Sequence, residues 1–233
     1  MDPVVILSPH LDDAVLSCGQ LMAGRPDVLV VTVMAGIPTD RVLRPFDRLC
    51  GFMDGYQAVV GRRLEDTDAV TSLHGRAYHL DFVDHQYDEP NDFDRLKTWV
   101  AQLVEEVRPE YVLAPVGLAH PDHATTTRAA IQSVPWAQLR FYEELPARVL
   151  WPELVAPALE NLVRWVKQQA DVTLPTGSRF HLERDPLGTG DLARKQAAVK
   201  RYVSQRAVLA QLEDGAGLYS LSCPERFWKV VPG

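Results

Sequence analysis

The sequence contains few of the features that mark secreted or membrane-spanning proteins. Its three cysteines, Cys18, Cys50 and Cys223, are odd in number and show no CxxC spacing, which argues against a disulfide framework or a cysteine zinc site. The apolar run near the start of the chain is short and ends at His10, so we expect neither a signal peptide nor a membrane span. We therefore expect a cytoplasmic protein without a membrane partner.

Positive charge is also scarce. The 233 residues carry a formal net charge of −7, and no basic stripe runs along the chain. Because binding to a phosphate backbone depends on clustered lysine and arginine, we expect no nucleic-acid partner. The length fits one α/β domain with a sizeable core and is marginal for two, so we predict a single domain over residues 1–233.

Short apolar runs alternate with segments of helical periodicity along most of the chain. Strands are predicted at residues 4–7, 28–34, 76–82, 111–116 and 139–142. Helices are predicted at residues 14–22, 55–73, 93–107, 125–134, 152–170 and 191–212, and a long loop at 39–53. This βαβ alternation predicts a Rossmann-like α/β domain, with a mostly parallel sheet and helices on both faces.

Reactive side chains follow the first predicted strand. Pro9 cannot donate to a sheet ladder, so the strand ends there and delivers His10, Asp12 and Asp13 at its carboxyl end. In open α/β sheets, ligands bind at that edge. A plainer interpretation is that Asp12 or Asp13 caps the next helix and that His10 is an ordinary turn histidine.

A second group of this kind, His120-Pro121-Asp122-His123, follows the fourth predicted strand. It precedes another predicted helix, as the first group does. Because the carboxyl ends of parallel strands meet at one edge of a sheet, the two groups can lie together. This pairing favours a functional site over two unrelated turns.

The residue types suit metal-assisted hydrolysis. A catalytic zinc site takes three protein ligands and leaves one position for water, and His10, Asp13 and His123 can supply them. Asp12 could then accept a proton from the water, while His120 could stabilise an oxyanion or protonate a departing nitrogen. We predict Zn²⁺, with Fe²⁺ or Co²⁺ as alternatives that the same ligands accept.

Both groups resemble the hallmarks of the PIG-L/LmbE-like family of zinc-dependent N-deacetylases, a His-x-Asp-Asp turn after the first strand and a later His-Pro-Asp-His turn. Arg62 and Glu65 match the family's Arg-x-x-Glu helix, and Asp84 matches an acidic residue after the third strand. Residues 195–205 resemble its closing Lys-x-x-Ala helix. The resemblance therefore covers most of the chain.

The resemblance implies that the protein removes the N-acetyl group from an amino-sugar-containing small molecule of the N-acetylglucosamine type. It implies zinc on His10, Asp13 and His123, with Asp12 as the general base. It also implies that His120 is the electrostatic partner of the tetrahedral intermediate.

Three further roles follow from the same resemblance. Asp122 would orient or charge-balance His120, and both Arg62 and Asp84 would reach sugar hydroxyls. Alternatives are an intrahelical pair between Arg62 and Glu65 and a solvated turn aspartate at Asp84.

This chain departs from the family pattern at two places. Leu11 and Ala14 stand where many members have proline and glutamate, which leaves the ligands intact but changes their surroundings. Leu118 stands where some members have a tyrosine, so more of the polarisation of the carbonyl would depend on His120.

Two other functions stay open. One is an amidase that cuts a larger acyl group, such as a thiol conjugate, from an aminoglycosidic partner. The other is a nucleotide-binding module without catalysis, although the first turn lacks the Gly-x-Gly-x-x-Gly that lets backbone approach a pyrophosphate. The sequence does not determine the sugar, the aglycone or the oligomeric state.

Overall fold

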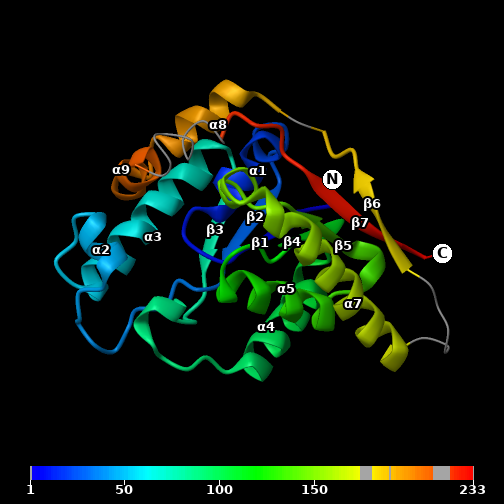
Figure 1. Ribbon diagram of the computed structural model, residues 1–233. Helices are drawn as coiled ribbons and strands as arrows, with labels where there is room; N and C mark the ends of the chain where they lie inside the picture. Colours follow the sequence, from blue (N-terminus) through cyan, green and yellow to red (C-terminus); the bar gives the residue numbers. More distant parts are fainter. Residues whose placement is uncertain (1, 174–179, 189, 212–220, 233) are drawn as a thin grey trace.

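The computed structural model describes residues 2–173, 180–188, 190–211 and 221–232, through which one sheet runs in the order β3-β2-β1-β4-β5-β7-β6 (Figure 1). Its strands are β1 (Val4–Ser8), β2 (Val28–Thr32), β3 (Arg76–His79), β4 (Tyr111–Pro115), β5 (Leu139–Tyr142), β6 (Phe180–Asp185) and β7 (Phe227–Pro232). β1 to β5 pair in parallel, whereas β7 is antiparallel to both β5 and β6. The mostly parallel sheet is confirmed, and its antiparallel edge is an addition that the periodicity did not predict.

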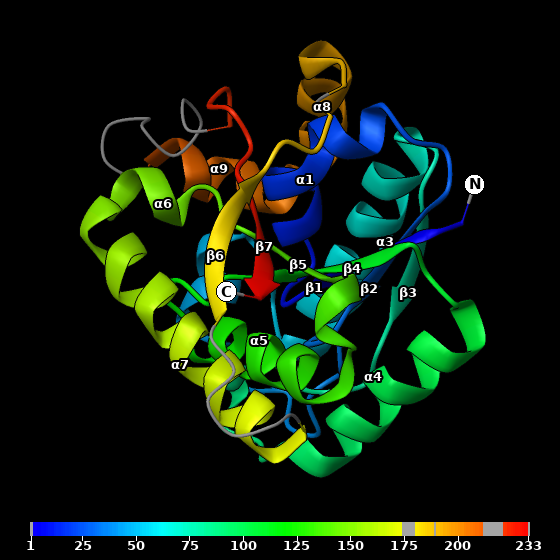
Figure 2. The ribbon, with the colours of Figure 1, turned by 90° about the vertical axis from the view of Figure 1, so that its right-hand side faces the viewer.

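Helices cover both faces of this sheet. They are α1 (Asp13–Ala23), α2 (Pro45–Leu49), α3 (Gly55–Ser72), α4 (Phe93–Val107), α5 (Pro121–Ser133), α6 (Ala147–Leu150), α7 (Val155–Thr173), α8 (Leu192–Val199) and α9 (Val203–Gln211), with short 3-10 turns η1 (His85–Tyr87), η2 (Trp136–Gln138) and η3 (Pro152–Leu154). Figure 2 shows the sheet between α1, α8 and α9 on one side and α4, α5 and α7 on the other. The Rossmann-like layering predicted from the sequence is therefore confirmed.

The first strand shows why the layers form. Val5 and Leu7 enter the hydrophobic layer beneath α4, α5 and α7, whereas Val4 and Ile6 enter the layer beneath α1 and α3. Successive side chains of a strand point to opposite faces, so an unbroken apolar run requires cover on both. All four side chains are fully buried, and each burial favours folding by roughly 1.5–3 kcal/mol.

The boundaries of α4 follow from its end residues. Asp92 is the N-cap, and its carboxylate accepts from the backbone N–H groups of Asp94 and Arg95. The preceding residue, Asn91, instead bonds the backbone of Val83 with its side chain. The helix ends at Val107. Its C-cap, Arg108, precedes a proline and adopts a left-handed φ of 48°.

The third strand is shorter than predicted. It ends at His79, which pairs with Thr32, the last residue of its neighbour β2. Beyond His79 the chain has no further strand to pair with, and Asp84 lies at the start of η1 rather than at a strand end. The predicted loop at 39–53 also contains a short helix, α2, that begins at Pro45.

Three predicted helices differ from the structure by more than a residue or two. The helix predicted over 152–170 is the turn η3 followed by α7, which continues to Thr173. The helix predicted from residue 125 begins at Pro121, because a proline fits the first helical position. The helix predicted over 191–212 is two helices, α8 and α9, and Leu212 lies outside the described residues. Between them lies the fully buried Tyr202, whose hydroxyl donates to Asp66 Oδ1 at 2.7 Å.

The strand order places the two reactive groups together. The chain moves from β1 outward to β2 and β3 and then returns to β4 on the other side of β1. The carboxyl ends of β1 and β4 therefore lie side by side at the point where the order reverses, the usual ligand site of such sheets. Among the described residues, no helix is both long and apolar enough to cross a membrane.

Candidate active site

The turn after β1 is held by its own polar groups. Ser8 Oγ donates to the carbonyl of His10 at 2.7 Å and accepts from the Ala14 N–H at 3.0 Å. The His10 N–H donates to Asp13 Oδ2 at 2.9 Å. Asp12 precedes the helix but makes no capping bond with its side chain. Asp12 therefore occupies the N-cap position of α1, as the plainer interpretation predicted, but its side chain does not cap the helix, and the residue lines a cavity.

The second group forms the start of α5. After β4 the chain turns through Gly117 and Ala119, whose φ angles are +98° and +59°, and His120 becomes the N-cap. Its Nδ1 accepts from the Asp122 N–H at 3.2 Å. Pro121 follows as the first helical residue, where its missing N–H costs no hydrogen bond. This cap directs His120, Asp122 and the following His123 toward the end of β1.

Three side-chain atoms form a small triangle. His10 Nδ1 and His123 Nε2 each lie 3.2 Å from Asp13 Oδ2, and the two nitrogens are 3.3 Å apart. Ligands that bind zinc tetrahedrally at about 2.0–2.1 Å are separated by roughly 3.3–3.4 Å. The three predicted ligands therefore fit one metal ion of that size. All three residues line the cavity, so a water molecule could reach the ion from there.

The remaining nitrogen of each histidine faces a carboxylate. His10 Nε2 lies 3.1 Å from Asp122 Oδ2, and His123 Nδ1 lies 3.2 Å from Glu144 Oε1. In metal sites, carboxylates in this position fix the orientation of the imidazole and increase its basicity. Both histidines thus have an orientation that could hold a metal ion, with one nitrogen toward the triangle and the other toward an acceptor.

The charges around the triangle favour a cation. Burial lowers the pKa of His123, but Asp13 and Glu144 outweigh it and raise that pKa to about 9. Burial opposes the charged form of Asp13, yet His123 and His10 hold the pKa of Asp13 far below its usual range. The imidazoles thus retain protons in the absence of another cation, and a bound metal would displace those protons.

Asp12 stands beside the triangle with a different environment. Burial, followed by repulsion from Asp13, raises the pKa of Asp12 to about 7, although His10 and Arg62 oppose this rise. Asp12 lines the same cavity as the triangle, but it is not one of the three residues whose ligand atoms form it. A carboxylate whose pKa is near neutrality can both accept and return a proton.

His120 is held in a defined protonation state by the backbone. Because the Asp122 N–H donates to His120 Nδ1, that nitrogen carries no proton and Nε2 carries it. Burial and then the neighbouring His10 lower the pKa of His120, which favours the neutral ring. The His120 ring lies 4.7 Å from that of His10 between centroids. It can therefore donate a hydrogen bond to a group bound next to the triangle.

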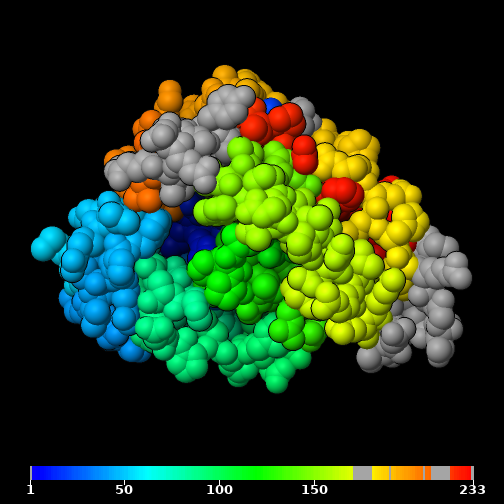
Figure 3. Space-filling model, viewed as in Figure 1, coloured from blue at the N-terminus to red at the C-terminus, as the bar shows by residue number. Residues whose placement is uncertain are grey.

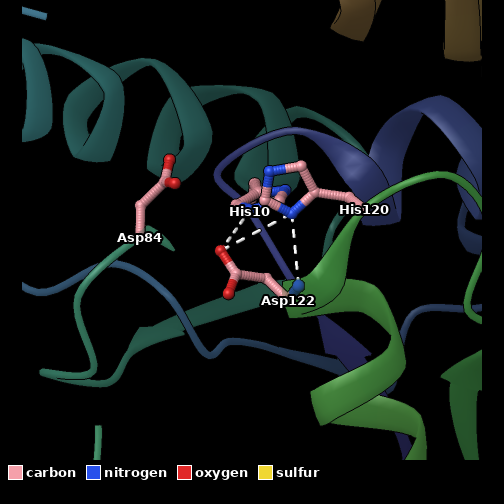
Figure 4. A group of neighbouring side chains, drawn as sticks. All are labelled: His10, Asp84, His120 and Asp122. Carbon is pink, nitrogen blue, oxygen red and sulfur yellow. Dashed lines mark hydrogen bonds and ion pairs between the residues drawn. The ribbon is translucent and has the colours of Figure 1, made fainter. Parts of the chain in front are cut away.

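Asp122 lies close to two histidines. Figure 4 shows its carboxylate beneath the rings of His10 and His120, with Asp84 to one side. The contact to His10 Nε2 is 3.1 Å and the contact to His120 Nδ1 is 3.6 Å. The resemblance implied a role toward His120 alone, whereas the shorter contact is with His10.

The four residues drawn in Figure 4 offer a second, looser set of possible metal ligands, whose atoms lie within 4.8 Å of one another. His120 Nδ1, however, already accepts a backbone hydrogen bond, and Asp84 accepts from the backbone N–H and side chain of Gln86. The triangle of His10, Asp13 and His123 is the better fit to a single ion.

The triangle lies at the floor of a cavity of about 460 Å³. Figure 3 shows this hollow, with the first residues of the chain, in dark blue, at its base. The predicted site residues that line it are His10, Asp12, Asp13, Arg62, Asp84, His120 and His123. Its size is that of a small-molecule site, so the structure brings all of these residues to one enclosed space.

Arg62 approaches the cavity from α3. Its side chain is 6% exposed and its Nη2 lies 2.8 Å from Asp47 Oδ1. Its guanidinium stacks 4.8 Å from the ring of Phe46. The alternative of an intrahelical pair with Glu65 is wrong, because Glu65 instead accepts from the N–H and hydroxyl of Ser204.

Three buried acids near the site were not predicted from the sequence. Glu144 holds His123, Asp47 holds Arg62, and Asp66 binds His79 and Tyr202. Glu144 follows β5 almost at once, so an acid at the carboxyl end of a parallel strand was a usable signal. Asp47 lies in the short helix α2 and Asp66 in α3, where no local pattern indicates their distant partners.

Comparisons with known proteins agree with this geometry. The family model described as PIG-L, GlcNAc-PI de-N-acetylase, matches residues 5–134. No curated protein matches the chain significantly in sequence.

Solved structures of deacetylases resemble the whole chain. The zinc-inhibited form of teicoplanin deacetylase Orf2 shares 25% identity at a TM-score of 0.75, covering 99% of this chain and 98% of its own. Dbv21, the A40926 pseudoaglycone deacetylase, shares 25% identity at 0.72, covering 99% and 97%. The N,N'-diacetylchitobiose deacetylase of Pyrococcus horikoshii, at 19% identity, TM-score 0.56 and coverage of 99% and 84%, shares the fold.

Proposed function

The chain belongs to the PIG-L family of N-deacetylases, and we propose on that basis that it hydrolyses the N-acetyl group of an amino-sugar-containing small molecule of the N-acetylglucosamine type. One observation carries this proposal. Three ligand atoms 3.2–3.3 Å apart lie at the floor of the cavity beside a carboxylate, Asp12, that neither caps a helix nor joins the triangle.

We propose zinc as the metal, held by His10, Asp13 and His123, with Fe²⁺ or Co²⁺ also compatible with these ligands. A divalent ion at this point supplies a Lewis acid that polarises the acetyl carbonyl and makes water more acidic. Asp122 and Glu144 orient the two histidines from behind. PIG-L deacetylases depend on a metal, and the donor set of this chain is consistent with that dependence.

Asp12 is the proposed general base. It takes a proton from the water that attacks the acetyl carbon and returns this proton to the sugar nitrogen when the carbon–nitrogen bond breaks. The water supplies two protons: the one that Asp12 carries completes the amine, and the one left on the new carboxyl group passes to that amine. The products are therefore acetate and an ammonium group on the sugar, and atoms and charge balance without another reactant. A carboxylate in this position can both accept the proton of the water and return it to the nitrogen.

His120 is the proposed oxyanion donor. Its Nε2–H is the only proton that the ring carries while Nδ1 accepts from the backbone, so the neutral ring donates a hydrogen bond rather than a proton. A donor placed before the charge develops lowers the barrier more than one that must reorganise. Of the two roles predicted from the sequence, we therefore favour stabilisation of the oxyanion.

We propose that Arg62 and Asp84 contact the sugar, since both line the cavity beside Asp12. We further propose that residues 1–233 form one catalytic domain, because the cavity is lined by residues as far apart as His10 and Gln205. Gln205 Nε2 donates to the backbone of Leu11 at 2.9 Å, which ties α9 to the site. The cytoplasmic location stays a prediction of the sequence.

The experiment is a substrate screen with metal-replete protein and direct detection of acetate. N-acetylglucosamine and its glycosides should release acetate, and the Asp12→Asn variant serves as the matched inactive control. If no acetylated sugar releases acetate while acylated cysteine conjugates are cleaved, the amidase function replaces this proposal.

A further inference from the structure

The mouth of the cavity is bordered by large aromatic side chains from two separate elements. Phe46 of α2 and Trp151, the residue that follows α6, both line the cavity, and each is 39% exposed. Deeper in the same cavity, Leu11, Met34 and Val59 are almost fully buried. The apolar lining therefore continues outward from the floor to the two rings, which we call the aromatic rim.

The helix that carries Phe46 buries a charged side chain and exposes apolar ones, the opposite of an ordinary surface helix. Asp47 is completely buried, whereas Phe46 and Leu49 are 39% and 62% exposed. Surface helices usually turn their apolar side chains to the core and their charges to water. In α2 the inward charge is matched by Arg62 and by the Tyr87 hydroxyl, which donates to Asp47 Oδ2 at 2.9 Å. The buried ion pair thus holds the apolar side chains outward.

The surrounding segment holds this arrangement in place. Thr39 N–H donates to Glu89 at 2.6 Å, and Arg44 Nη2 donates to the carbonyl of Tyr87 at 2.9 Å. Asp54 caps α3 by accepting from the Gln57 N–H at 2.7 Å. The exposure of Phe46 therefore comes from a segment that is bonded at both ends to the rest of the protein.

Further exposed apolar side chains lie on the same segment of the chain. They are Ile37, Val42, Leu49, Met53 and Tyr56, each at least 37% exposed. Apolar residues scattered singly on a surface need no explanation, but a group beside a cavity usually marks a binding surface. Figure 3 shows this segment, in light blue, as one wall of the hollow, with the yellow-green region of α6 on the other side.

We propose that the aromatic rim is a subsite for an apolar, ring-containing aglycone joined to the acetylated sugar. This inference rests on the proposed function, since the acetamido group must reach the triangle at the floor. Whatever is joined to the sugar then extends outward between Phe46 and Trp151. A planar apolar group there leaves water and gains ring contacts, whereas a polar group would lose its hydration against aromatic faces.

The test compares two glycosides that differ only in the aglycone, the methyl and phenyl glycosides of N-acetylglucosamine. The measured quantity is the ratio of kcat/KM for phenyl to kcat/KM for methyl, taken on the same protein sample. This ratio cancels differences in metal content and in folded fraction. The wild type should prefer the phenyl glycoside by about tenfold, the effect of one aromatic ring removed from water.

Trp151→Ala should bring the ratio close to one, and Trp151→Phe should restore part of the preference. Phe46→Ala provides a second variant on the opposite side of the mouth. The matched control is Trp136→Ala, because Trp136 is 36% exposed but lines a different cavity, beside Phe180. Trp136→Ala should keep the ratio of the wild type.

The outcomes separate this inference from the proposed function. If both glycosides release acetate with equal kcat/KM in the wild type, the subsite is refuted while the deacetylase function stands. If neither releases acetate, the proposed function itself fails. The inference is also overturned if the phenyl-to-methyl ratio is the same in the wild type and in Trp151→Ala while only the wild type binds lipid vesicles. The aromatic rim would then be a surface that binds lipid.

Discussion

Replacing Glu144 by glutamine should weaken metal binding while the protein stays folded. Glu144 is 1% exposed, and its Oε1 accepts from the N–H groups of Gly117 and Leu118 at 2.7 Å each and faces His123 Nδ1 at 3.2 Å. A glutamine carbonyl can accept the same three bonds, but it carries no negative charge. The imidazole of His123 then becomes a weaker donor to the metal.

The expected size follows from the role of such carboxylates. Losing one partner behind a metal-binding histidine typically lowers metal affinity by about 10–100-fold. Glu144→Ala should act differently, because it leaves the two backbone donors buried and unpaired, at a cost of roughly 2–6 kcal/mol. That cost is a large part of the roughly 5–15 kcal/mol that stabilises a typical protein. The glutamine variant should therefore stay folded, whereas the alanine variant should unfold at a clearly lower temperature.

The assay measures the zinc dissociation constant by competition with a chelator and, separately, the Tm of the metal-free protein. Glu143→Gln is the matched control, because Glu143 is adjacent and equally buried but accepts from Trp228 Nε1 at 2.9 Å and pairs with Arg148. It should lower the Tm without changing the zinc affinity. Wild-type zinc affinity in Glu144→Gln, or an equal loss in Glu143→Gln, would refute the reasoning.

Four further results are expected. Removing the metal with a chelator should abolish acetate release, and adding zinc back should restore it, since the metal polarises the carbonyl; activity in metal-free protein would contradict the site. Asp12→Asn should keep zinc while kcat falls by roughly a hundredfold to ten-thousandfold. Asp13→Ala should lose zinc, and its activity should recover in part with excess metal; the reverse pattern would exchange the roles of the two aspartates. His120→Ala should lower kcat by about a hundredfold or more at near wild-type metal content, because it removes the oxyanion donor, and metal loss there would make it a ligand. Lys195→Met should lower the free energy of unfolding by about 3–5 kcal/mol, measured in urea, because the carboxylate of Glu225, 2.8 Å away, would stay buried without the cation that pairs with it. An unchanged value would contradict this role of the ion pair.

Much of the fold and the centre of the site can be predicted from short stretches of sequence. The apolar run before Pro9 requires burial on both faces and must end at the proline, so it predicts both a central strand and the place where His10 leaves it. The second group, His120 to His123, follows another such strand. Local sterics and burial decide these features, and they act within a few residues of the chain.

Only the tertiary structure decides which partner each side chain meets. Glu144 lies 21 residues from His123 in the chain, and His10 meets an Asp122 that is 112 residues away. The direction of a carboxylate over such separations depends on strand order and on loops, for which no local pattern exists. The antiparallel pairing of β6 with β7 and the exposure of Phe46 likewise depend on distant segments and have no local pattern. Residue types and spacing thus determined the chemistry of this protein, and the packing of distant segments decided which side chains orient it.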